Sequence, residues 1–396
     1  MRALGPILLT VFLDLLGFGL VIPLLSFYAE DFQASELQVT LLMACYSLAQ
    51  FLGAPLWGQV SDRYGRRPVL LISIGASVVF LSGFAAATTL WQLFVFRTLH
   101  GFAAANISTA QAAVADVTEG PDRARGMGLI GAAFGIGFSL GPFLGGQLSG
   151  YGLAAPIWLA AALSAINLIW VFFGFPETRP TGGAQTEGVR RRTINPRAML
   201  DGLRHPIVGM TIGLLFVATF AFAMMEATFA LVAEHSWSMT ARDVGNLFGW
   251  IGMIGIVVQG GLIRHLVKRF GEPRLIVAGY LCNALGLLVL ALASGTLGIW
   301  GGCALLALGA GMANPSLQAL LSRSAPAEEQ GTVLGVAQSF GSLARAVAPG
   351  VGGLLYAGVV PTAAFGAASV LMLVALVLAW PATRRAQQAL LHATES

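Results

Sequence analysis

Long apolar runs alternate with short polar connections along the whole 396-residue chain. A run of about twenty apolar residues is long enough to cross the hydrocarbon core of a bilayer as a helix. The pattern therefore predicts twelve transmembrane helices, and the first run is too long for the apolar part of a cleaved signal peptide. The expected ranges are 5–28, 40–61, 68–88, 91–114, 125–149, 153–174, 206–233, 242–266, 273–294, 296–320, 330–355 and 361–381.

The composition agrees with a polytopic all-α membrane protein. Hydrophobic residues make up 56% of the chain and charged residues 10%, with a mean hydropathy of +0.78, whereas about a quarter of the residues in soluble proteins are charged. Cys45, Cys282 and Cys303 all lie inside apolar runs without paired or metal-ligand spacing. We therefore expect neither disulfides nor a zinc site, and no other metal or cofactor.

The basic residues predict the orientation in the membrane. Of the 22 Lys and Arg residues, all except Arg97, Arg242 and Arg345 lie at the termini or in the connections on one side of the predicted helices. Because such residues concentrate on the cytoplasmic side, we expect both termini to be cytoplasmic, in the inner or plasma membrane. The net charge of +4 then reflects topology, and we expect no nucleic-acid partner.

The two halves of the chain resemble each other. Arg63-Tyr64-Gly65 recurs as Arg269-Phe270-Gly271, and Gly101 recurs as Gly309 at nearly the same distance along the chain. Repeats of this kind indicate duplication of a six-helix unit. We expect an N-terminal six-helix bundle over 1–175, a cytoplasmic linker over 176–205, and a C-terminal six-helix bundle with a short tail over 206–396.

A charged segment separates the second and third predicted helices. Its sequence, GQVSDRYGRR, places four charges between two apolar runs, and the residues that form its pattern are Gly58, Asp62, Arg63, Gly65, Arg66 and Arg67. An ordinary basic turn would be one explanation. The segment also resembles the signature loop of the major facilitator superfamily, roughly G-x-x-x-D-R-x-G-R-R. That resemblance implies two six-helix bundles that bind substrate between them, with this loop as a cytoplasmic gate.

Two further segments extend the resemblance to the drug/proton antiporters of that superfamily. The fifth predicted helix is similar to their glycine-proline motif through Gly131, Gly135, Gly141, Pro142, Gly145 and Gly146. Gly131, Gly135 and Gly145 would let a neighbouring backbone approach, and Pro142 would bend the helix. The fourth helix carries Arg97-Thr98-Leu99-His100-Gly101, which looks like the R-x-x-Q-G element with His100 in place of Gln.

Asp14 and Glu226 are the acidic residues that lie well inside predicted helices. A charge at mid-bilayer costs about 3 kcal/mol or more, so such residues face a cavity or a partner and mark transport pathways. The first helix, with Leu13-Asp14, Gly17 and Pro23, resembles that of the tetracycline/proton antiporters. A carboxyl whose surroundings alternate between dry and wet can take up a proton on one side and release it on the other. We therefore expect Asp14 to carry the coupling proton.

The roles of the intramembrane basic residues are open at this point. Arg97 would tune Asp14, or the two would form a permanent ion pair that only joins helices. Glu226 would be a second proton site or a contact for a cationic substrate. His100 would titrate with them or only hydrogen-bond within its helix. Arg345 would bind an anionic substrate or pair with Glu226.

Substrate contacts are expected among polar and aromatic groups inside the helices, which would otherwise face lipid or join helices. The candidates are Asn106, Gln111, Phe222, Glu226, Trp250, Gln259, Asn314, Gln318 and Arg345. The sequence thus predicts a monomeric proton-coupled antiporter that exports drug-like amphipathic molecules. The alternative is an organic-anion or metabolite carrier of the same fold, working as a uniporter or symporter. Because no catalytic constellation is apparent, an enzyme or a sensor is disfavoured.

Overall fold

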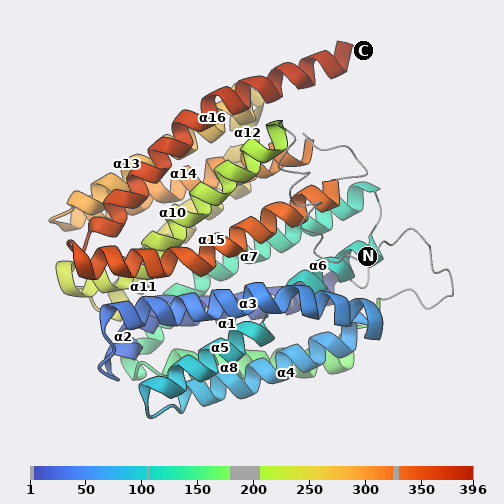
Figure 1. Ribbon diagram of the computed structural model, residues 1–396. Coiled ribbons are helices and arrows are strands. Elements are labelled where there is room, and N and C mark those ends of the chain that lie inside the picture. The colour runs from blue at the N-terminus through green and yellow to red at the C-terminus, as the bar shows by residue number, and fades with distance from the viewer. Residues whose placement is uncertain (1–3, 105–106, 119, 179–205, 324–329, 396) are drawn as a thin grey trace. The chain divides into compact units, whose positions relative to one another are not determined.

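The computed structural model describes residues 4–104, 107–118, 120–178, 206–323 and 330–395. Within these ranges the regular structure is entirely helical, as Figure 1 shows, which confirms the predicted all-α class. Each of the expected ranges coincides with a helical segment. Nine segments of the described part are long and apolar enough to cross a membrane, so the total of twelve stays a prediction.

The helices fall into two units by their contacts, and each unit is described by itself. The first unit consists of Met1–Ile194 and Met239–Gly249, and the second of Asn195–Ser238 and Trp250–Ser396. The helices of the first stretch are α1 (Leu4–Val21), η1 (Ile22–Leu24), α2 (Leu25–Glu30), α3 (Glu36–Tyr64), α4 (Arg66–Ala85), α5 (Leu90–Ala103), α6 (Ile107–Val117), α7 (Gly120–Leu148), η2 (Ser149–Tyr151) and α8 (Ala155–Gly174).

The later part of the chain supplies the remaining helices. They are α10 (Pro206–Trp237), α11 (Ala241–Val257), the π turn η3 (Val258–Leu262), α12 (Ile263–Phe270), α13 (Glu272–Leu292), α14 (Thr296–Arg323), α15 (Gln330–Gly358) and α16 (Ala363–Glu395). The first residues of α11 group with the first unit, although its sequence belongs to the predicted C-terminal bundle.

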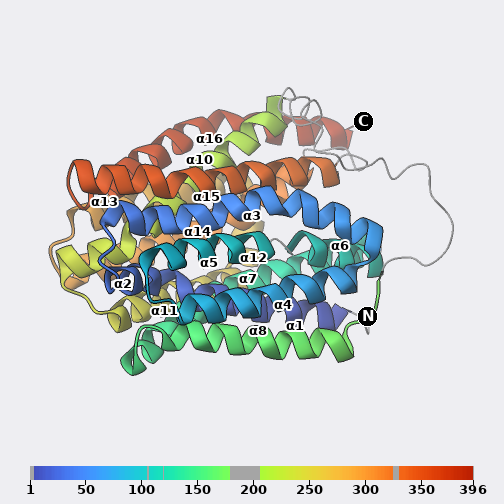
Figure 2. The same ribbon diagram turned by 60° about the horizontal axis from the view of Figure 1, so that its bottom comes forward.

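In the first unit, α1 packs against both α7 and α8, α3 packs against α5, and α4 packs against α5 and α8 (Figures 1 and 2). The contact between α1 and α7 depends on missing side chains. A Cβ built at Gly141 would collide with the backbone of Gly19, and one at Gly145 would collide with the carbonyl oxygen of Leu20. Small residues therefore let α1 and α7 pack closely along the part of α1 that follows Asp14.

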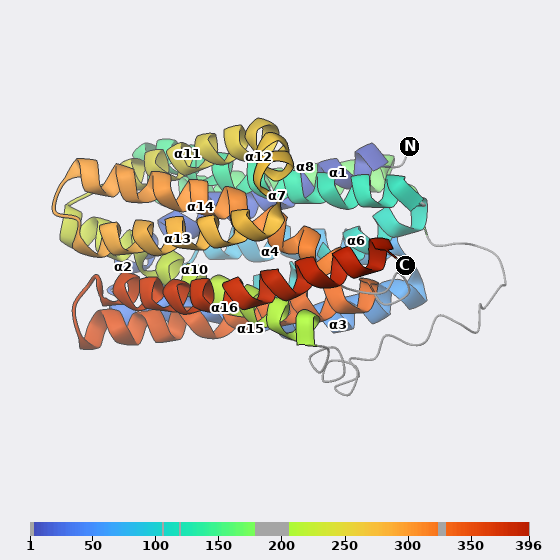
Figure 3. The ribbon, with the colours of Figure 1, turned by 90° about the horizontal axis from the view of Figure 1, so that it is seen from above.

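In the second unit, α13 lies beside α14, and α10 packs against α15 and α16 (Figure 3). A Cβ at Gly279 would meet Gly309 and Ala313 of α14, so this contact also depends on small residues. Glu226 lies on α10 and Arg345 on α15, and the packing of these two helices brings the residues into one region of the unit.

Three expected helices are interrupted rather than continuous. Pro23, which has no N–H to donate, lies in the 3-10 turn η1 between α1 and α2. A π turn, η3, lies between α11 and α12. Within the range expected over 91–114, the first helix, α5, ends at Ala103. There Trp57, Ser73 and Gln50 donate to the carbonyls of Phe102, Ala103 and Ala104, which satisfies backbone groups that a continuous helix would bond internally.

Candidate functional site: a charged turn and a buried arginine cluster

The signature loop is a tight turn between α3 and α4. Gly65 ends α3 with φ +106°, a conformation that side-chain-bearing residues rarely adopt. A Cβ at this position would also collide with the carboxylate of Glu177. The backbone conformation therefore favours glycine between Tyr64 and Arg66, and a side chain there would also displace the Glu177 carboxylate.

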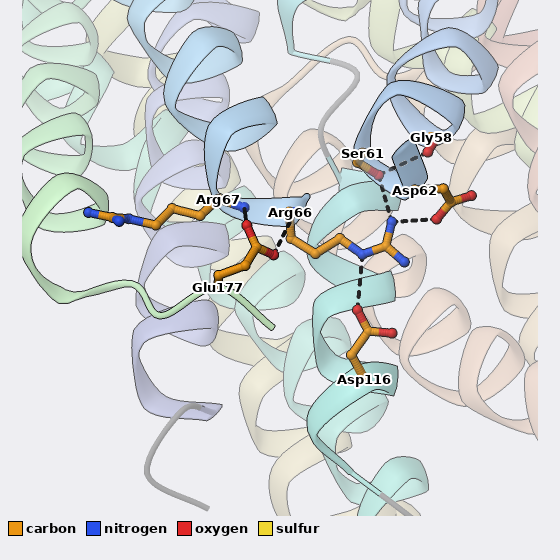
Figure 4. Close-up of polar contacts among 7 residues, drawn as sticks. All are labelled: Gly58, Ser61, Asp62, Arg66, Arg67, Asp116 and Glu177. Carbon is orange, nitrogen blue, oxygen red and sulfur yellow. Dashed lines mark hydrogen bonds and ion pairs between the residues drawn. The ribbon is translucent and has the colours of Figure 1, made fainter. Parts of the chain in front are cut away.

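Arg66 is the centre of the polar contacts around this turn. Its side chain is 10% exposed and forms ion pairs with Asp62, one turn earlier, and with Asp116 of α6, where Nε lies 3.0 Å from Oδ2 (Figure 4). Its Nη1 also donates to Ser61 Oγ at 2.8 Å. A guanidinium that is removed from water needs such partners, because an unpaired buried charge is costly. The turn therefore connects α3, α4 and α6.

Glu177, which follows α8, caps the N-terminus of α4. Its carboxylate accepts the backbone N–H of Arg66 at 2.8 Å and that of Arg67 at 3.2 Å (Figure 4). A carboxylate at a helix N-terminus also interacts favourably with the helix dipole. Arg67 in turn donates to the carbonyl of Phe172 on α8. These contacts join the end of the sixth predicted helix to the start of the third.

The remaining residues of the loop are more accessible. The side chain of Asp62 is 54% exposed, the guanidinium of Arg63 lies 5.3 Å from the ring centroid of Tyr64, and no described atom lies within 4 Å of a Cβ built at Gly58. The contacts of Asp62 and Arg66 given above all lie inside the first unit. The role of the loop as a gate stays a prediction.

Sequence reasoning did not select Asp116 or Glu177 as functional residues. Both belong to stretches that resemble the tetracycline/proton antiporters, Asp116-Val117-Thr118 and Phe175-Pro176-Glu177-Thr178. The signal that could have identified these two residues is that the arginines of the loop need carboxylate partners.

Asp14 lies on α1 beside α8. Its Oδ1 accepts a hydrogen bond of 2.9 Å from Asn167 Nδ2, which also donates to the carbonyl of Thr10 at 3.2 Å. Asn167 is completely buried. An amide in a predicted transmembrane helix is a sequence signal in its own right, and it was overlooked among the candidates.

Arg97, His100 and Gly101 of α5 all contact Tyr46 of α3. The Arg97 guanidinium lies 4.3 Å from the centroid of the Tyr46 ring, and the His100 ring lies 5.3 Å from it. A Cβ at Gly101 would collide with the backbone of Tyr46. The R-x-x-H-G element therefore surrounds one aromatic side chain. Arg97 and Asp14 both lie close enough to the Tyr46 hydroxyl for their charges to act on it, so Tyr46 is near two of the expected coupling residues.

Arg97 is 2% exposed and His100 6%. Among the described residues, Nε and Nη1 of Arg97 and Nδ1 of His100 have no hydrogen-bond partner. Arg97 instead lies against aromatic rings. Besides Tyr46, its guanidinium also lies 5.9 Å from the centroid of the Phe18 ring. The cation–π contact offsets part of the cost of burying the charge.

The second unit contains a separate pair of charges, Glu226 and Arg345, that are both partly buried. Glu226 Oε1 is buried without a hydrogen-bond partner in the described part of this unit, and it interacts electrostatically with Arg345. Arg345 Nη2 donates to Ser342 Oγ at 3.2 Å. Phe222, one turn before Glu226 on α10, is 38% exposed.

The other expected substrate contacts are dispersed. Trp250 lies 5.9 Å from Trp300, ring to ring, Gln259 is exposed in the π turn, Asn314 and Gln318 are exposed one turn apart on α14, and Gln111 is partly buried on α6. Asn106 lies outside the described residues. Within the described ranges, His, Cys, Asp and Glu form no group of three that could hold a metal ion.

The glycine-proline motif lies on α7, where Pro142 is inside the helix. Gly141 and Gly145 face α1 as described, and Gly146 approaches Gly245, a residue that groups with the first unit. Nearby, Gln147 Nε2 donates to Asn246 Oδ1 at 2.8 Å. No described atom lies within 4 Å of a Cβ built at Gly135, so the close approach expected there is absent from the described part. The surroundings of Gly131 are not described.

Comparison with known proteins adds a family relationship to this geometry. The family model described as Major Facilitator Superfamily matches residues 7–349. The Tetracycline resistance protein, class C, of Escherichia coli is 34% identical over 364 residues, covering 90% of each protein. Multidrug resistance protein 2 of Bacillus subtilis (strain 168) is 28% identical over 353 residues, 88% of each. The crystal structure of the human organic anion transporter MFSD10 (TETRAN) has a TM-score of 0.74 at 26% identity and covers 96% of this chain and 99% of that one.

Proposed function

The chain belongs to the major facilitator superfamily, and on that premise we propose that it exports drug-like amphipathic molecules in exchange for protons. The similarity to the class C tetracycline resistance protein and to Multidrug resistance protein 2 extends over most of each chain and supports an export function. Proteins of this architecture move substrate by alternating access, in which two bundles rock around a site near the bilayer midplane.

The proposed architecture consists of two six-helix bundles, 1–175 and 206–396, connected by a cytoplasmic linker over 176–205. The protein works as a monomer in the plasma membrane with both termini in the cytoplasm. The asymmetric distribution of Lys and Arg supports this orientation.

The observation that carries the proposal is the carboxyl group of Asp14 inside an apolar helix, held by an amide that is itself completely buried. Asp14 carries the coupling proton. Arg97 tunes it, and Tyr46 lies near both charges. Glu226, with Arg345 nearby, serves as a second proton site or contacts a cationic substrate. The loop Gly58–Arg67 acts as the cytoplasmic gate.

We expect substrate binding to release a proton from the wild-type protein and not from Asp14→Asn. The reason is that proton and substrate compete for one form of the carrier, and an amide cannot release the proton in question. The measurement is proton release from purified protein in weakly buffered solution across a panel of drug-like compounds. Asp31→Asn is the matched control, because this carboxylate lies outside the apolar part of the helix.

Two results would contradict this assignment. Proton release from Asp14→Asn that equals the wild-type signal would exclude Asp14 as the coupling residue. Binding of compounds without any proton release from the wild-type protein would favour a uniporter.

A second candidate function is an organic-anion or metabolite carrier of the same fold, working as a uniporter or symporter. Two observations favour it: the likeness to the human organic anion transporter, and the absence of a hydrogen-bond partner for Nε and Nη1 of Arg97 within the described residues. Uptake of a labelled organic anion into cells would distinguish it from the antiporter: an inward proton gradient would drive uptake by a symporter or leave a uniporter unaffected, whereas it would drive export by an antiporter.

A further inference from the structure

Arg97 and His100 present unused hydrogen-bonding atoms on the same side of α5. They are one helical turn apart, and both are more than nine-tenths buried. Nε and Nη1 of Arg97 and Nδ1 of His100 have no partner among the described residues. Buried polar groups are nearly always satisfied in native proteins, so each exception calls for an explanation.

No described carboxylate forms an ion pair with Arg97. Arg66, by contrast, pairs with Asp62 and Asp116. Arg97 instead has the face of Tyr46 at 4.3 Å, and a ring that covers the face of a guanidinium leaves its N–H groups free at the edge. A guanidinium donates strongly to carboxylates and similar anions through that edge.

Aromatic side chains continue from this point. The ring of Phe18 lies 5.1 Å from that of Tyr46 and 5.7 Å from that of Phe138. Phe18 and Phe138 are both partly exposed, whereas Tyr46 is buried. A flat apolar group can therefore contact the accessible rings while its charged end reaches inward to the cation.

We propose that Arg97 and His100 form a subsite for the anionic group, a carboxylate or an enolate, of an aromatic amphipathic substrate. Arg97 supplies the charge, and His100 donates a second hydrogen bond from Nδ1 in the tautomer that carries its proton there. This inference rests on the proposed export function and adds the charge of the exported molecule. It also gives a role to His100, which replaces the Gln of the related motif.

The test uses a matched pair of probes, radiolabelled 1-naphthoate and the neutral 1-naphthamide, which differ in charge and hardly in shape. Equilibrium dialysis with the purified full-length protein measures both affinities. We expect the carboxylate to bind at least about tenfold more tightly than the amide. Arg97→Gln should bring this ratio to about one, and Arg97→Lys should retain part of it. His100→Gln should lower the ratio less than Arg97→Gln does.

The matched control is Arg264→Gln, which removes an exposed arginine of α12 and should leave the ratio unchanged. The proposal is wrong if the wild-type protein does not prefer the carboxylate, or if the Arg264 and Arg97 variants lose the preference equally. Competition by chloride as strong as that by naphthoate would identify an inorganic-anion site and also overturn it. If Arg97→Gln does not fold, the test rests on Arg97→Lys, which should retain only part of the wild-type affinity ratio.

Failure of this inference can be told from failure of the proposed function. Proton-coupled export of a neutral or cationic compound from proteoliposomes, without any preference for carboxylates, would leave the exporter standing and remove the anion subsite. Carboxylate binding through Arg97 without proton-coupled transport would support the anion subsite and contradict the proton-coupled exporter.

Discussion

Arg66 is the residue on which the packing around the signature loop depends most. It is almost buried and pairs with two carboxylates of very different exposure, since Asp62 is 54% exposed and Asp116 18%. A solvent-exposed ion pair contributes about 1 kcal/mol at most to stability. Removing the partner of a largely buried charge costs more, because that charge is left uncompensated. The two halves of this network should therefore contribute differently to stability and to transport.

We expect Arg66→Gln to lower the free energy of unfolding by about 1–3 kcal/mol, because it leaves Asp116 without its charged partner. Asp62→Asn should change it by less than about 1 kcal/mol, because water screens the exposed pair. The measurement is the thermal unfolding of both purified variants under the same conditions. Equal losses would show that the burial of Arg66 does not determine the effect.

The same Asp62→Asn variant separates stability from gating. If the loop is a gate, this variant should slow transport in proteoliposomes while substrate binding stays at the wild-type level. Complete loss of binding would instead mean that the loop shapes the substrate site.

At the scale of elements, the lengths of the apolar runs were sufficient to predict the described helical segments, because each must be long enough to cross the same bilayer. The interruption after Ala103 could not be predicted in this way. The groups that satisfy the freed carbonyls come from Gln50, Trp57 and Ser73 on other helices. Nothing in the local sequence shows that those side chains will be there.

The candidate site, too, could be predicted only in part, because only some of its residues stand out within an apolar run. A charge in an apolar run is conspicuous, so Asp14, Arg97 and Glu226 were identified by the cost of burying them. Tyr46 was not, because it is an ordinary residue of its helix until packing places it beside a charge. Asn167 is different, because a polar amide in an apolar run is itself a signal. For Gly135, the resemblance alone predicted a close contact that the described residues do not make.

The contact between α3 and α5 gives a prediction at this scale. A methyl group at Gly101 would overlap the backbone of Tyr46, so Gly101→Ala should force the two helices apart and lower stability by about 1–3 kcal/mol. Gly213→Ala on α10 is the matched control, because no described atom lies within 4 Å of a Cβ there. This control should be neutral or stabilising, since alanine favours helix over glycine.

Thermal unfolding of both glycine variants checks this prediction, together with the naphthoate-to-naphthamide affinity ratio. Gly101→Ala should also reduce that ratio, because Arg97 and His100 are on the same helix as Gly101. Equal stability of the two variants would mean that α3 and α5 separate without cost.

At the scale of the whole molecule, the positive-inside rule predicts which ends of the helices face the cytoplasm. The prediction can be checked because exposed residues are available at both ends of the predicted spans. Tyr151 is 86% exposed and Leu297 91%. Tyr151 lies in a connection and Leu297 at the start of the expected helix 296–320, both at ends expected to be outside the cell. Lys268, an exposed residue of α12, lies in a connection expected to be cytoplasmic.

We therefore expect a cysteine at position 151 or 297 to react with a membrane-impermeant maleimide in intact cells. A cysteine at position 268 should react only after the membrane is permeabilised. The background is a variant in which Cys45, Cys282 and Cys303 are replaced by Ser or Ala, and that variant without an added cysteine is the control. Labelling of position 268 in intact cells, with 151 and 297 protected, would show that the orientation is the reverse of the predicted one. It would also place Asp14 nearer the outer surface, because Asp14 is closer to the first residue of the stretch Leu4–Glu30 than to its last.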